Sequence, residues 1–470
     1  MNNIIGIRHE DLYVSERRAP LTPEHVNFLI KEKNLDIVIQ MSDKRIFTNR
    51  EYQQAGARLA CDLKECSVIL GVKEIPVEKY EAGKTYIHFS HVVKGQEANM
   101  PRLKRMMELN CNLIDYEKIT DEQGHRLIYF GYHAGVAGMI NTLWALGLRY
   151  LEEGIITPFL KIKQAHKYHS LDEAISEISE VGAQIAEEGL PDAILPLTVG
   201  FTGYGHVSQG AQEILGLLPV KEISPQVVLK LKNRSCSPKN LIYKVVFRHE
   251  HIAENKEGKP FDKEDYYKHP EQYRGIFEQY LPGLSVLMNC MYWEPRFPRL
   301  VTKEAVGRLF NEAVLTESGN ALFGDNLPAP VPIVLGPKLK VIGDITCDPD
   351  GSIEITHKGT EPDDPLFLYD PFTCKQTMGY KGPGLLVMAV HILPSELPRE
   401  SSQKFSSALI HYLRPIAKCN FEVEYDNLEL PEAIKRALIV HKGKLTPPYE
   451  YLQQFTDTVT TENLLKLSTP

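Results

Sequence analysis

The chain has 470 residues, and its hydrophobic share of 43% and charged share of 24% are typical of a globular protein with a buried core. The formal net charge of −8 excludes a strongly basic surface, so nucleic acid is not an expected partner. No stretch approaches the roughly 18 apolar residues that a membrane-spanning helix needs, so no membrane contact is expected either. The eight cysteines lack the close pairs of a zinc site or disulfide scaffold, which favours a reducing compartment and no bound metal.

Length and the N-terminal segment set expectations for domain count and compartment. A chain this long exceeds what one hydrophobic core usually organises, so two domains are expected. The N-terminal residues run directly into a strand-like pattern without a signal or transit peptide, so we expect a cytoplasmic protein. A presequence that had been removed would leave the same start and would place the protein in the mitochondrial matrix. The sequence sets no oligomeric state and is compatible with a homo-oligomer.

Short apolar runs alternate with polar, helix-like stretches in roughly the first 115 residues. This alternation predicts a parallel sheet whose strands are connected by helices. Residues 136–151 are apolar on nearly every side and predict a helix buried between layers or domains. The apolar runs of the first part are Ile4–Ile7, Ile37–Ile39, Val68–Val72, Tyr86–Phe89 and Asn112–Ile114.

A second α/β pattern follows. Ser170 and Glu173 predict a capping box ahead of an amphipathic helix that ends at Gly189. A strand predicted over Leu195–Phe201 is followed by a glycine turn and a helical pattern. Further core-like runs lie at 284–288, 341–345 and 385–391, and helices are predicted over 402–413 and 430–440. We predict a substrate-binding α/β domain over 1–135, completed by 395–470, and a dinucleotide-binding domain over 136–394.

Two of the buried runs end in a polar residue that suits chemistry. Lys73 follows residues 67–72, and His91 follows residues 85–90. Ligands of parallel α/β sheets bind at the carboxyl ends of the strands, so an amine and an imidazole are expected at that edge. The alternative for both residues is an ordinary solvated side chain at a strand end.

The glycine turn predicts a dinucleotide site. Gly203 and Gly205 would let backbone N–H groups approach a pyrophosphate, and His206 and Val207 begin the helix behind them. Ser208 stands where the third glycine of the usual motif would be, which leaves a structural turn as the alternative.

The residue that reads the adenosine ribose is expected at the end of the next strand. Glu222 lies near the expected distance, and an acid there would favour NAD. Lys221 or Arg234 would instead hold the 2′-phosphate of NADP. The sequence does not decide between the two cofactors.

Several longer motifs occur along essentially the whole chain. They are SERRAPLTP at 15–23, LGVK at 70–73, FSHVVK at 89–94, IDYEK at 114–118, AGVAGMI at 134–140, FTGYG at 201–205, YWE at 292–294 and GDI at 343–345. Together they resemble the lysine-ketoglutarate reductase half of bifunctional α-aminoadipic semialdehyde synthases. More distantly they are similar to saccharopine dehydrogenases and alanine dehydrogenase. At His391 the family has an aspartate, so the polar contact of that aspartate is not carried over.

The resemblance implies two Rossmann-like parallel-sheet domains with the active site in the interdomain cleft. It implies reductive condensation of L-lysine with 2-oxoglutarate to saccharopine, the first step of lysine degradation. The implied cofactor is NADPH, with NADH as the alternative. A saccharopine-oxidising domain or protein is the implied partner.

This reaction needs proton transfers near neutral pH. His91 is therefore the candidate general acid/base, because an unperturbed imidazole has a pKa of about 6.5. Lys73 would polarise the carbonyl, pair with a carboxylate or, with a lowered pKa, share the proton transfer.

The substrates and saccharopine carry several carboxylates and amines. Arg18 matches the family's carboxylate-binding arginine, with an ion pair to Glu16 as the alternative. Glu117 is the candidate partner of the lysine amino group, with an ion pair to Lys118 as the alternative. Further candidates are Arg8 and Lys94 for the substrate, and Asn289 and Trp293 for the nicotinamide pocket.

Three other functions stay open. An NAD-dependent, lysine-forming saccharopine dehydrogenase runs the same chemistry in the opposite direction. An alanine-dehydrogenase-like enzyme would use pyruvate and ammonia, and a catalytically inactive regulatory module would bind nucleotide without turnover.

The sequence His249-Glu250-His251 lacks the second-turn histidine of a metal-binding helix and predicts an exposed loop.

Overall fold

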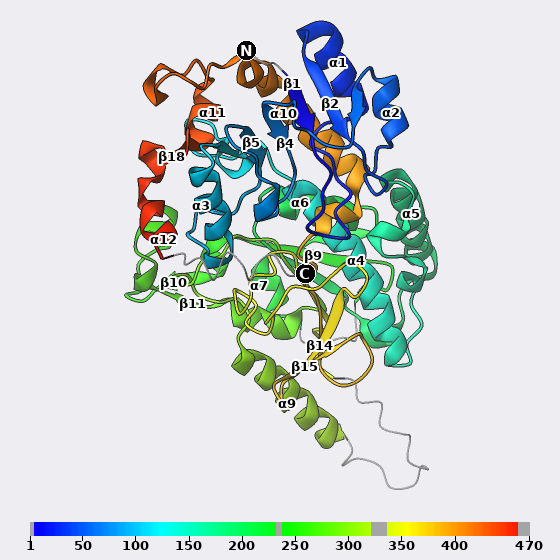
Figure 1. Cartoon of the computed structure of the whole chain (residues 1–470). Coiled ribbons are helices and arrows are strands. Elements are labelled where there is room, and N and C mark those ends of the chain that lie inside the picture. Colours follow the sequence, from blue (N-terminus) through cyan, green and yellow to red (C-terminus); the bar gives the residue numbers. More distant parts are fainter. Residues whose placement is uncertain (1–3, 232–236, 321–335, 459–470) are drawn as a thin grey trace. The chain divides into compact units, whose positions relative to one another are not determined.

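The computed structural model describes residues 4–231, 237–320 and 336–458 (Figure 1). The chain divides into two compact units: unit 1 comprises Met1–Phe130 and Pro398–Pro470, and unit 2 comprises Gly131–Leu397. The expected boundaries, after residue 135 and before residue 395, lie close to these. Each unit contains an eight-stranded, largely parallel sheet, which confirms the predicted class of two Rossmann-like α/β domains.

The sheet of unit 1 has the strand order β18-β17-β6-β5-β4-β1-β2-β3. Strands β1 to β6 run parallel. Strand β17 pairs antiparallel with β6, and β18 pairs antiparallel with β17 at the edge of the sheet. The strands are β1 (Ile4–Ile7), β2 (Asp36–Gln40), β3 (Arg58–Ala60), β4 (Val68–Leu70), β5 (Thr85–His88), β6 (Asn112–Asp115), β17 (Leu438–His441) and β18 (Lys444–Leu445).

Helices cover both faces of this sheet. Alternate residues of each strand point to opposite sides and pack into the two cores. Ile37 and Ile39 of β2 share one core with the helices α1 (Pro23–Lys33) and α10 (Pro398–Lys418). Val38, between them, belongs to the core on the other face, with α3 (Met100–Glu108). The remaining helices of unit 1 are α2 (Asn49–Gln54), α11 (Glu432–Ala437) and α12 (Gln453–Thr456).

The helix predicted over residues 430–440 is wrong in its second half. Helix α11 ends at Ala437, and Leu438–His441 form β17, which pairs with β6. Leu438, Ile439 and Val440 are fully buried there. A short apolar run can complete either a helix or a strand, and the unpaired edge of β6 selects the strand.

The sheet of unit 2 has the strand order β15-β14-β16-β13-β12-β7-β9-β8. Its strands are β7 (Thr198–Thr202), β8 (Val220–Glu222), β9 (Ile242–Phe247), β12 (Val286–Asn289), β13 (Val341–Asp344), β14 (Leu366–Asp370), β15 (Lys375–Met378) and β16 (Leu385–Met388). A separate hairpin pairs β10 (Ala253–Asn255) with β11 (Tyr273–Gly275). The helices are α4 (Gly131–Glu152), α5 (Leu171–Glu188), α6 (His206–Leu215), α7 (Pro225–Val228), α8 (Lys263–Lys268) and α9 (Lys303–Asn320).

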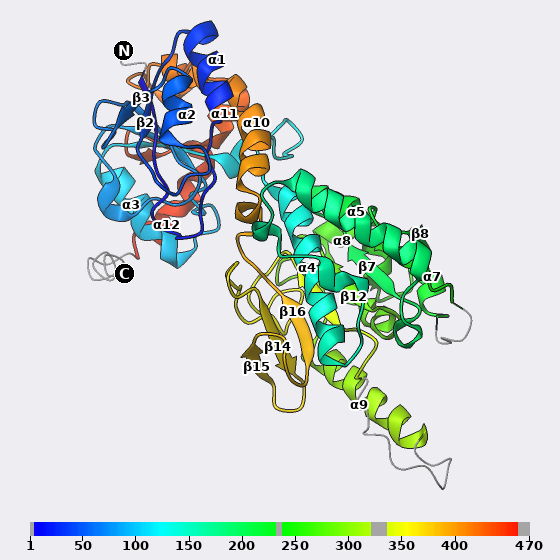
Figure 2. The ribbon, with the colours of Figure 1, turned by 90° about the vertical axis from the view of Figure 1, so that its right-hand side faces the viewer.

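Helix α4, which is mostly buried as predicted, packs closely against α6. A Cβ atom on Gly135 of α4 would lie 1.9 Å from the carbonyl oxygen of Val207, and one on Gly210 of α6 would lie 2.2 Å from that of Tyr132. Because Gly210 has no side chain, α6 can pack directly on the backbone of α4, and this contact fixes the direction in which α6 starts. Figure 2 shows α4 and α5 together beside the sheet of unit 2. No helix within the described residues is long and apolar enough to cross a membrane.

Candidate functional site

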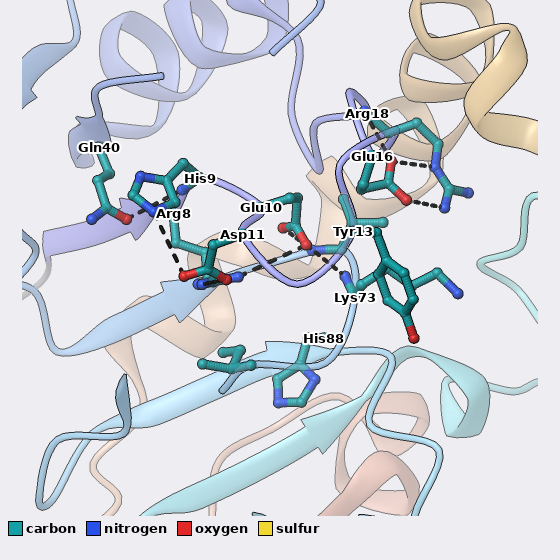
Figure 3. A network of polar contacts seen from close by, with 12 residues as sticks. Arg8, His9, Glu10, Asp11, Tyr13, Glu16, Arg18, Gln40, Lys73 and His88 are labelled. Carbon is teal, nitrogen blue, oxygen red and sulfur yellow. Dashed lines mark hydrogen bonds and ion pairs between the residues drawn. The ribbon is translucent and has the colours of Figure 1, made fainter. Parts of the chain in front are cut away.

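Polar residues follow three neighbouring parallel strands of unit 1. Strand β4 lies between β1 and β5 in the sheet. Arg8 follows β1 directly, Lys73 lies three residues after the end of β4, and His91 lies three residues after the end of β5. The structure thus brings these predicted side chains to one edge of unit 1, and Figure 3 shows the contacts around Lys73.

Two buried carboxylates hold the segments that leave these strands. Glu10 accepts hydrogen bonds from the backbone N–H groups of Val72, at 2.8 Å, and Lys73, at 3.0 Å. Asp115, at the end of β6, accepts from the backbone N–H group and the hydroxyl of Ser90. Burial raises the pKa of Glu10 and raises that of Asp115 to about 6. Sequence reasoning missed both, and the available signal was their position at the end of a predicted strand.

The Lys73 ammonium group makes no hydrogen bond or ion pair with any residue that the structure describes. Its Nζ atom lies 5.5 Å from the centre of the Tyr13 ring. Burial and the positive charge of Arg18 lower the pKa of Lys73, although neighbouring carboxylates oppose the shift. Lys73 is therefore closer to releasing its proton at neutral pH than an exposed lysine.

His91 pairs with Glu74, which lies directly after Lys73 in the chain. The Nδ1 atom of His91 is 2.5 Å from Oε1 of Glu74. Burial opposes the charged form of His91, but the hydrogen bond and charge of Glu74 outweigh it, so the pKa of His91 is raised. Conversely, His91 overcomes the effect of burial and lowers the pKa of Glu74 to about 2. Sequence reasoning missed Glu74, whose position beside Lys73 was the available signal.

His91 also has an unusual backbone conformation. Its φ angle is 52°, in the left-handed region that residues with a side chain seldom adopt. Its ring is stacked on Phe89 with a centroid separation of 6.2 Å, and 31% of the side chain is exposed. The backbone strain, the stacking and Glu74 together fix the orientation of a partly accessible imidazole.

Arg18 forms the ion pair with Glu16 that was the alternative to a substrate-binding role. The guanidinium donates from Nε and Nη2 to the two carboxylate oxygens, at 2.8 and 2.5 Å. It also lies over the ring of Phe130, 4.2 Å from the centroid. The pair is buried, not superficial, since only 4% of the Arg18 side chain is exposed. The Nη1 atom makes no hydrogen bond with any described residue.

The other predicted substrate-binding residues differ in accessibility. Arg8 is buried and contacts Asp11 at 2.6 Å and Glu10 at 3.8 Å. Glu117 is paired with Arg126 at 2.6 Å, not with its sequence neighbour Lys118. Lys94 is exposed. The negative charge of Glu117 contributes to the raised pKa of His91, because it favours the protonated imidazole.

The glycine turn of unit 2 fits a nucleotide pyrophosphate. Gly203 has a φ angle of 83°, and Gly205 is the N-cap of α6 with no side-chain cap on the helix N–H groups. A Cβ on Gly205 would have no atom of a described residue within 4 Å, which leaves space in front of the helix among these residues. His206 is exposed, Val207 is half-buried, and Ser208 is fully buried in the first turn of α6.

Glu222 does not lie where the ribose-binding residue was expected. Strand β8 is at the edge of the sheet, with β9 between it and β7. Glu222 is level with Lys244 of β9 and Val199 of β7, three residues before the end of β7. Its carboxylate pairs with the Lys244 ammonium at 2.7 Å. Arg234, the alternative cation, lies outside the described residues.

Asn289 is the last residue of β12, next to β7, and Trp293 follows this strand, but the polar groups of both are engaged within the protein. Asn289 is fully buried; its amide donates to Asp344 and Ser352, each at 2.8 Å, and accepts from the Thr202 hydroxyl at 3.1 Å. The Trp293 indole N–H contacts two backbone carbonyls, each at 3.1 Å. Asn289 therefore links the ends of three strands. Within the described residues, no group of three or more metal-binding side chains is found.

Comparisons with known proteins identify the family and the fold of the chain. Residues 6–137 match the N-terminal domain of the alanine dehydrogenase/PNT family, and residues 339–448 match its C-terminal domain. The chain is 38% identical to α-aminoadipic semialdehyde synthase from Arabidopsis thaliana, over 96% of this chain and 41% of that protein. It is 25% identical to saccharopine dehydrogenase (NAD(+), L-lysine-forming) from Neurospora crassa, over 87% of this chain and 89% of that protein.

A solved structure of L-alanine dehydrogenase has the same fold, with a TM-score of 0.56 and 17% identity over 97% of this chain and 99% of that chain. The chain thus spans less than half the length of the Arabidopsis protein but nearly all of the alanine dehydrogenase. The matches confirm the resemblance that the motifs indicated. The chain belongs to the superfamily of alanine dehydrogenase and saccharopine dehydrogenase, a group of nicotinamide-nucleotide oxidoreductases, and within it is similar to part of α-aminoadipic semialdehyde synthase.

Proposed function

We propose that this chain condenses L-lysine with 2-oxoglutarate and reduces the resulting imine with NADPH to give saccharopine. The observation that carries the proposal is that the Lys73 ammonium, which forms no ion pair with any described residue, follows a strand next to the one that the Glu74–His91 pair adjoins. The similarity to α-aminoadipic semialdehyde synthase supports the same substrates.

The chemistry requires two opposite proton transfers. The ε-amine of the substrate lysine must lose a proton before its nitrogen attacks the ketone carbon of 2-oxoglutarate. The carbinolamine that forms must then gain a proton on its hydroxyl group, so that water leaves and a protonated imine remains. The nicotinamide nucleotide, when bound, supplies the hydride that reduces the imine carbon.

Lys73 is suited to the first transfer and His91 to the second. The lowered pKa of Lys73 increases the fraction of neutral amine, which can accept a proton from the substrate ammonium. The raised pKa of His91 increases the fraction of imidazolium, which can donate a proton to the leaving hydroxyl. Glu74 acts through His91 by holding Nδ1 and stabilising the charged ring.

Two arginines provide positive charge for the carboxylates. The Nη1 atom of Arg18 is the donor that we assign to a substrate carboxylate, because Nε and Nη2 are held by Glu16. The Nη1 atom of Arg8 is buried, lies 3.8 Å from Oε2 of Glu10 and makes no hydrogen bond within the described part of the chain. Glu16 and Asp11 orient the two guanidinium groups and offset their repulsion.

The test is the oxidation of NADPH and of NADH in separate assays with lysine and 2-oxoglutarate, each substrate being omitted in turn, with saccharopine identified as the product. The proposal requires NADPH oxidation that depends on both substrates. Preference for NADH would indicate the saccharopine dehydrogenase of the lysine-forming type. Turnover with pyruvate and ammonia alone would indicate an alanine-dehydrogenase-like enzyme, and nucleotide binding without turnover a regulatory module.

A further inference from the structure

The strand order of unit 2 places a different residue beside the glycine turn from the one that the sequence suggested. Strand β9 is the neighbour of β7, and Phe247 at its end is level with Thr202 at the end of β7. The N–H group of Gly203 donates to the carbonyl oxygen of Phe247 at 3.2 Å. The next residue, Arg248, therefore leaves the sheet alongside the glycine turn.

Arg248 belongs to a group of cations and tyrosines around this turn. Tyr204, inside the turn, is 41% exposed, and its ring lies 5.7 Å from the guanidinium carbon of Arg248 and 5.7 Å from the Lys263 ammonium. His249 lies between two tyrosines, with Nδ1 3.2 Å from the Tyr204 hydroxyl and Nε2 3.0 Å from that of Tyr267. The histidine thus fixes the aromatic surface between the two cations.

The two cations are available to an anion. Both side chains are exposed, and neither forms an ion pair with a carboxylate among the residues that the structure describes. In dinucleotide-binding folds, the residue after the strand next to the glycine turn contacts the adenosine ribose; an acid there binds the 2′-hydroxyl of NAD, and an arginine accommodates the 2′-phosphate of NADP. This chain has Arg248 at that position, and the acid Glu250 comes two residues later.

We propose that Arg248 and Lys263 bind the 2′-phosphate of NADP, with the Tyr204 ring held between them by His249. The inference rests on nicotinamide-nucleotide binding at the glycine turn, as in the proposed function. It assigns cofactor preference to the ends of β9 and α8, and it excludes Glu222 and Lys221 of β8 from the phosphate site. A planar guanidinium suits bidentate phosphate binding, and the lysine adds a second charge.

The test compares the affinities of the full-length chain for 2′,5′-ADP and 5′-AMP by titration calorimetry, a readout that does not depend on turnover. Arg248→Gln and Lys263→Gln are each expected to weaken 2′,5′-ADP binding by about 10- to 100-fold, since one charged hydrogen bond is lost. Binding of 5′-AMP should stay within about twofold, since it lacks the 2′-phosphate. Lys221→Gln, an exposed lysine at β8, is the matched control and should leave both affinities unchanged.

Two results would overturn the inference while leaving the proposed reaction intact. One is that NADPH-dependent saccharopine formation persists while Arg248→Gln and Lys263→Gln bind 2′,5′-ADP as tightly as the unaltered chain. The other is that, of the three variants, only Lys221→Gln weakens the binding of 2′,5′-ADP. A stronger preference for NAD than for NADP, lost in Glu250→Gln, would also overturn it. If the unaltered chain bound neither nucleotide, both the inference and the proposed function would fail.

Discussion

The Nδ1 atom of His91 lies 2.5 Å from Oε1 of Glu74, and this contact sets the charge of both groups. Against the effect of burial, it raises the pKa of His91 and lowers that of Glu74 to about 2. The contact therefore favours the charged form of both groups. Lys73, the residue before Glu74, has a pKa that burial shifts in the opposite direction. These shifts favour the charged form of His91 and the neutral form of Lys73, which suits the acid and base roles that we propose for them.

Glu74→Gln should move the alkaline limb of the pH profile of kcat/KM to lower pH. The reason is that removal of the carboxylate charge lowers the pKa of His91, so the proton-donating form is lost earlier as pH rises. The profile for saccharopine formation measures this shift.

The control is Asp350→Asn, which alters a histidine–carboxylate pair of the same length in unit 2. His357 Nδ1 lies 2.5 Å from Asp350 Oδ1 there. This variant should keep the original profile. An unchanged profile in Glu74→Gln would mean that His91 does not donate the proton.

Lys73→Met should lower kcat by about 100-fold or more, because the variant lacks the base that we propose accepts the substrate proton. Lys73→Arg should be similarly impaired, since an arginine keeps its charge at neutral pH and cannot act as a base. The fold should persist, because Glu10 holds residue 73 through its backbone N–H group. Lys79→Met, at an exposed lysine on the same segment, serves as control. Full turnover by Lys73→Arg would show that only the positive charge is needed.

Arg18→Lys should raise the KM for 2-oxoglutarate by about tenfold or more, because a lysine cannot hold Glu16 and a substrate carboxylate with the same geometry. Thermal stability should fall as well, since the ion pair is buried. Arg58→Lys is the control for the effect on KM, because Arg58 also pairs with two acids but has an exposed side chain. A loss of stability with an unchanged KM would leave Arg18 with a structural role alone.

Gly205→Ala should weaken nucleotide binding by about tenfold or more while the melting temperature stays unchanged. The φ angle of −81° suits alanine, and no atom lies within 4 Å of the added Cβ. The methyl group would instead occupy the space that a pyrophosphate needs in front of α6. Titration calorimetry and thermal unfolding together separate the two effects. Unchanged affinity would place the pyrophosphate elsewhere.

Gly210→Ala should destabilise the protein by about 1–3 kcal/mol or more, because the added Cβ would lie 2.2 Å from the Tyr132 carbonyl oxygen. The helices α4 and α6 would have to separate. Gly307→Ala in α9 is the matched control: no atom lies within 4 Å, and alanine should stabilise that helix by about 0.5–1 kcal/mol. Urea unfolding measures both. Equal effects would refute the close packing of α4 against α6.

Features that depend on neighbours in the chain could be predicted well. The hydroxyl of Ser170 accepts from the Glu173 N–H group at 3.2 Å, as the helix-start pattern indicated, although the Glu173 carboxylate binds His169 in place of Ser170. Gly189 ends the helix with a φ angle of 83°. The turn at Gly203 has the strand before it and the helix after it that the sequence indicated. Each of these depends on a few adjacent residues.

The errors concern contacts between distant segments. The strand over 438–441 was predicted as helix because its apolar run carries no information about the free edge of β6. Glu222 was assigned to the ribose because chain order was taken for the order of strands in the sheet, whereas β9 lies between β8 and β7.

The sequence by itself determined most of the buried parallel strands, the glycine turn and the presence of an amine and an imidazole after strand ends, because periodicity and turn chemistry act over a few residues. The tertiary structure alone decided which groups meet. Glu10 binds the backbone of Lys73 across 63 positions, and Glu74 meets His91 across 17. Because a pKa depends on burial and on charges brought close by the fold, the proton-transfer roles that we propose for Lys73 and His91 depend on that assembly.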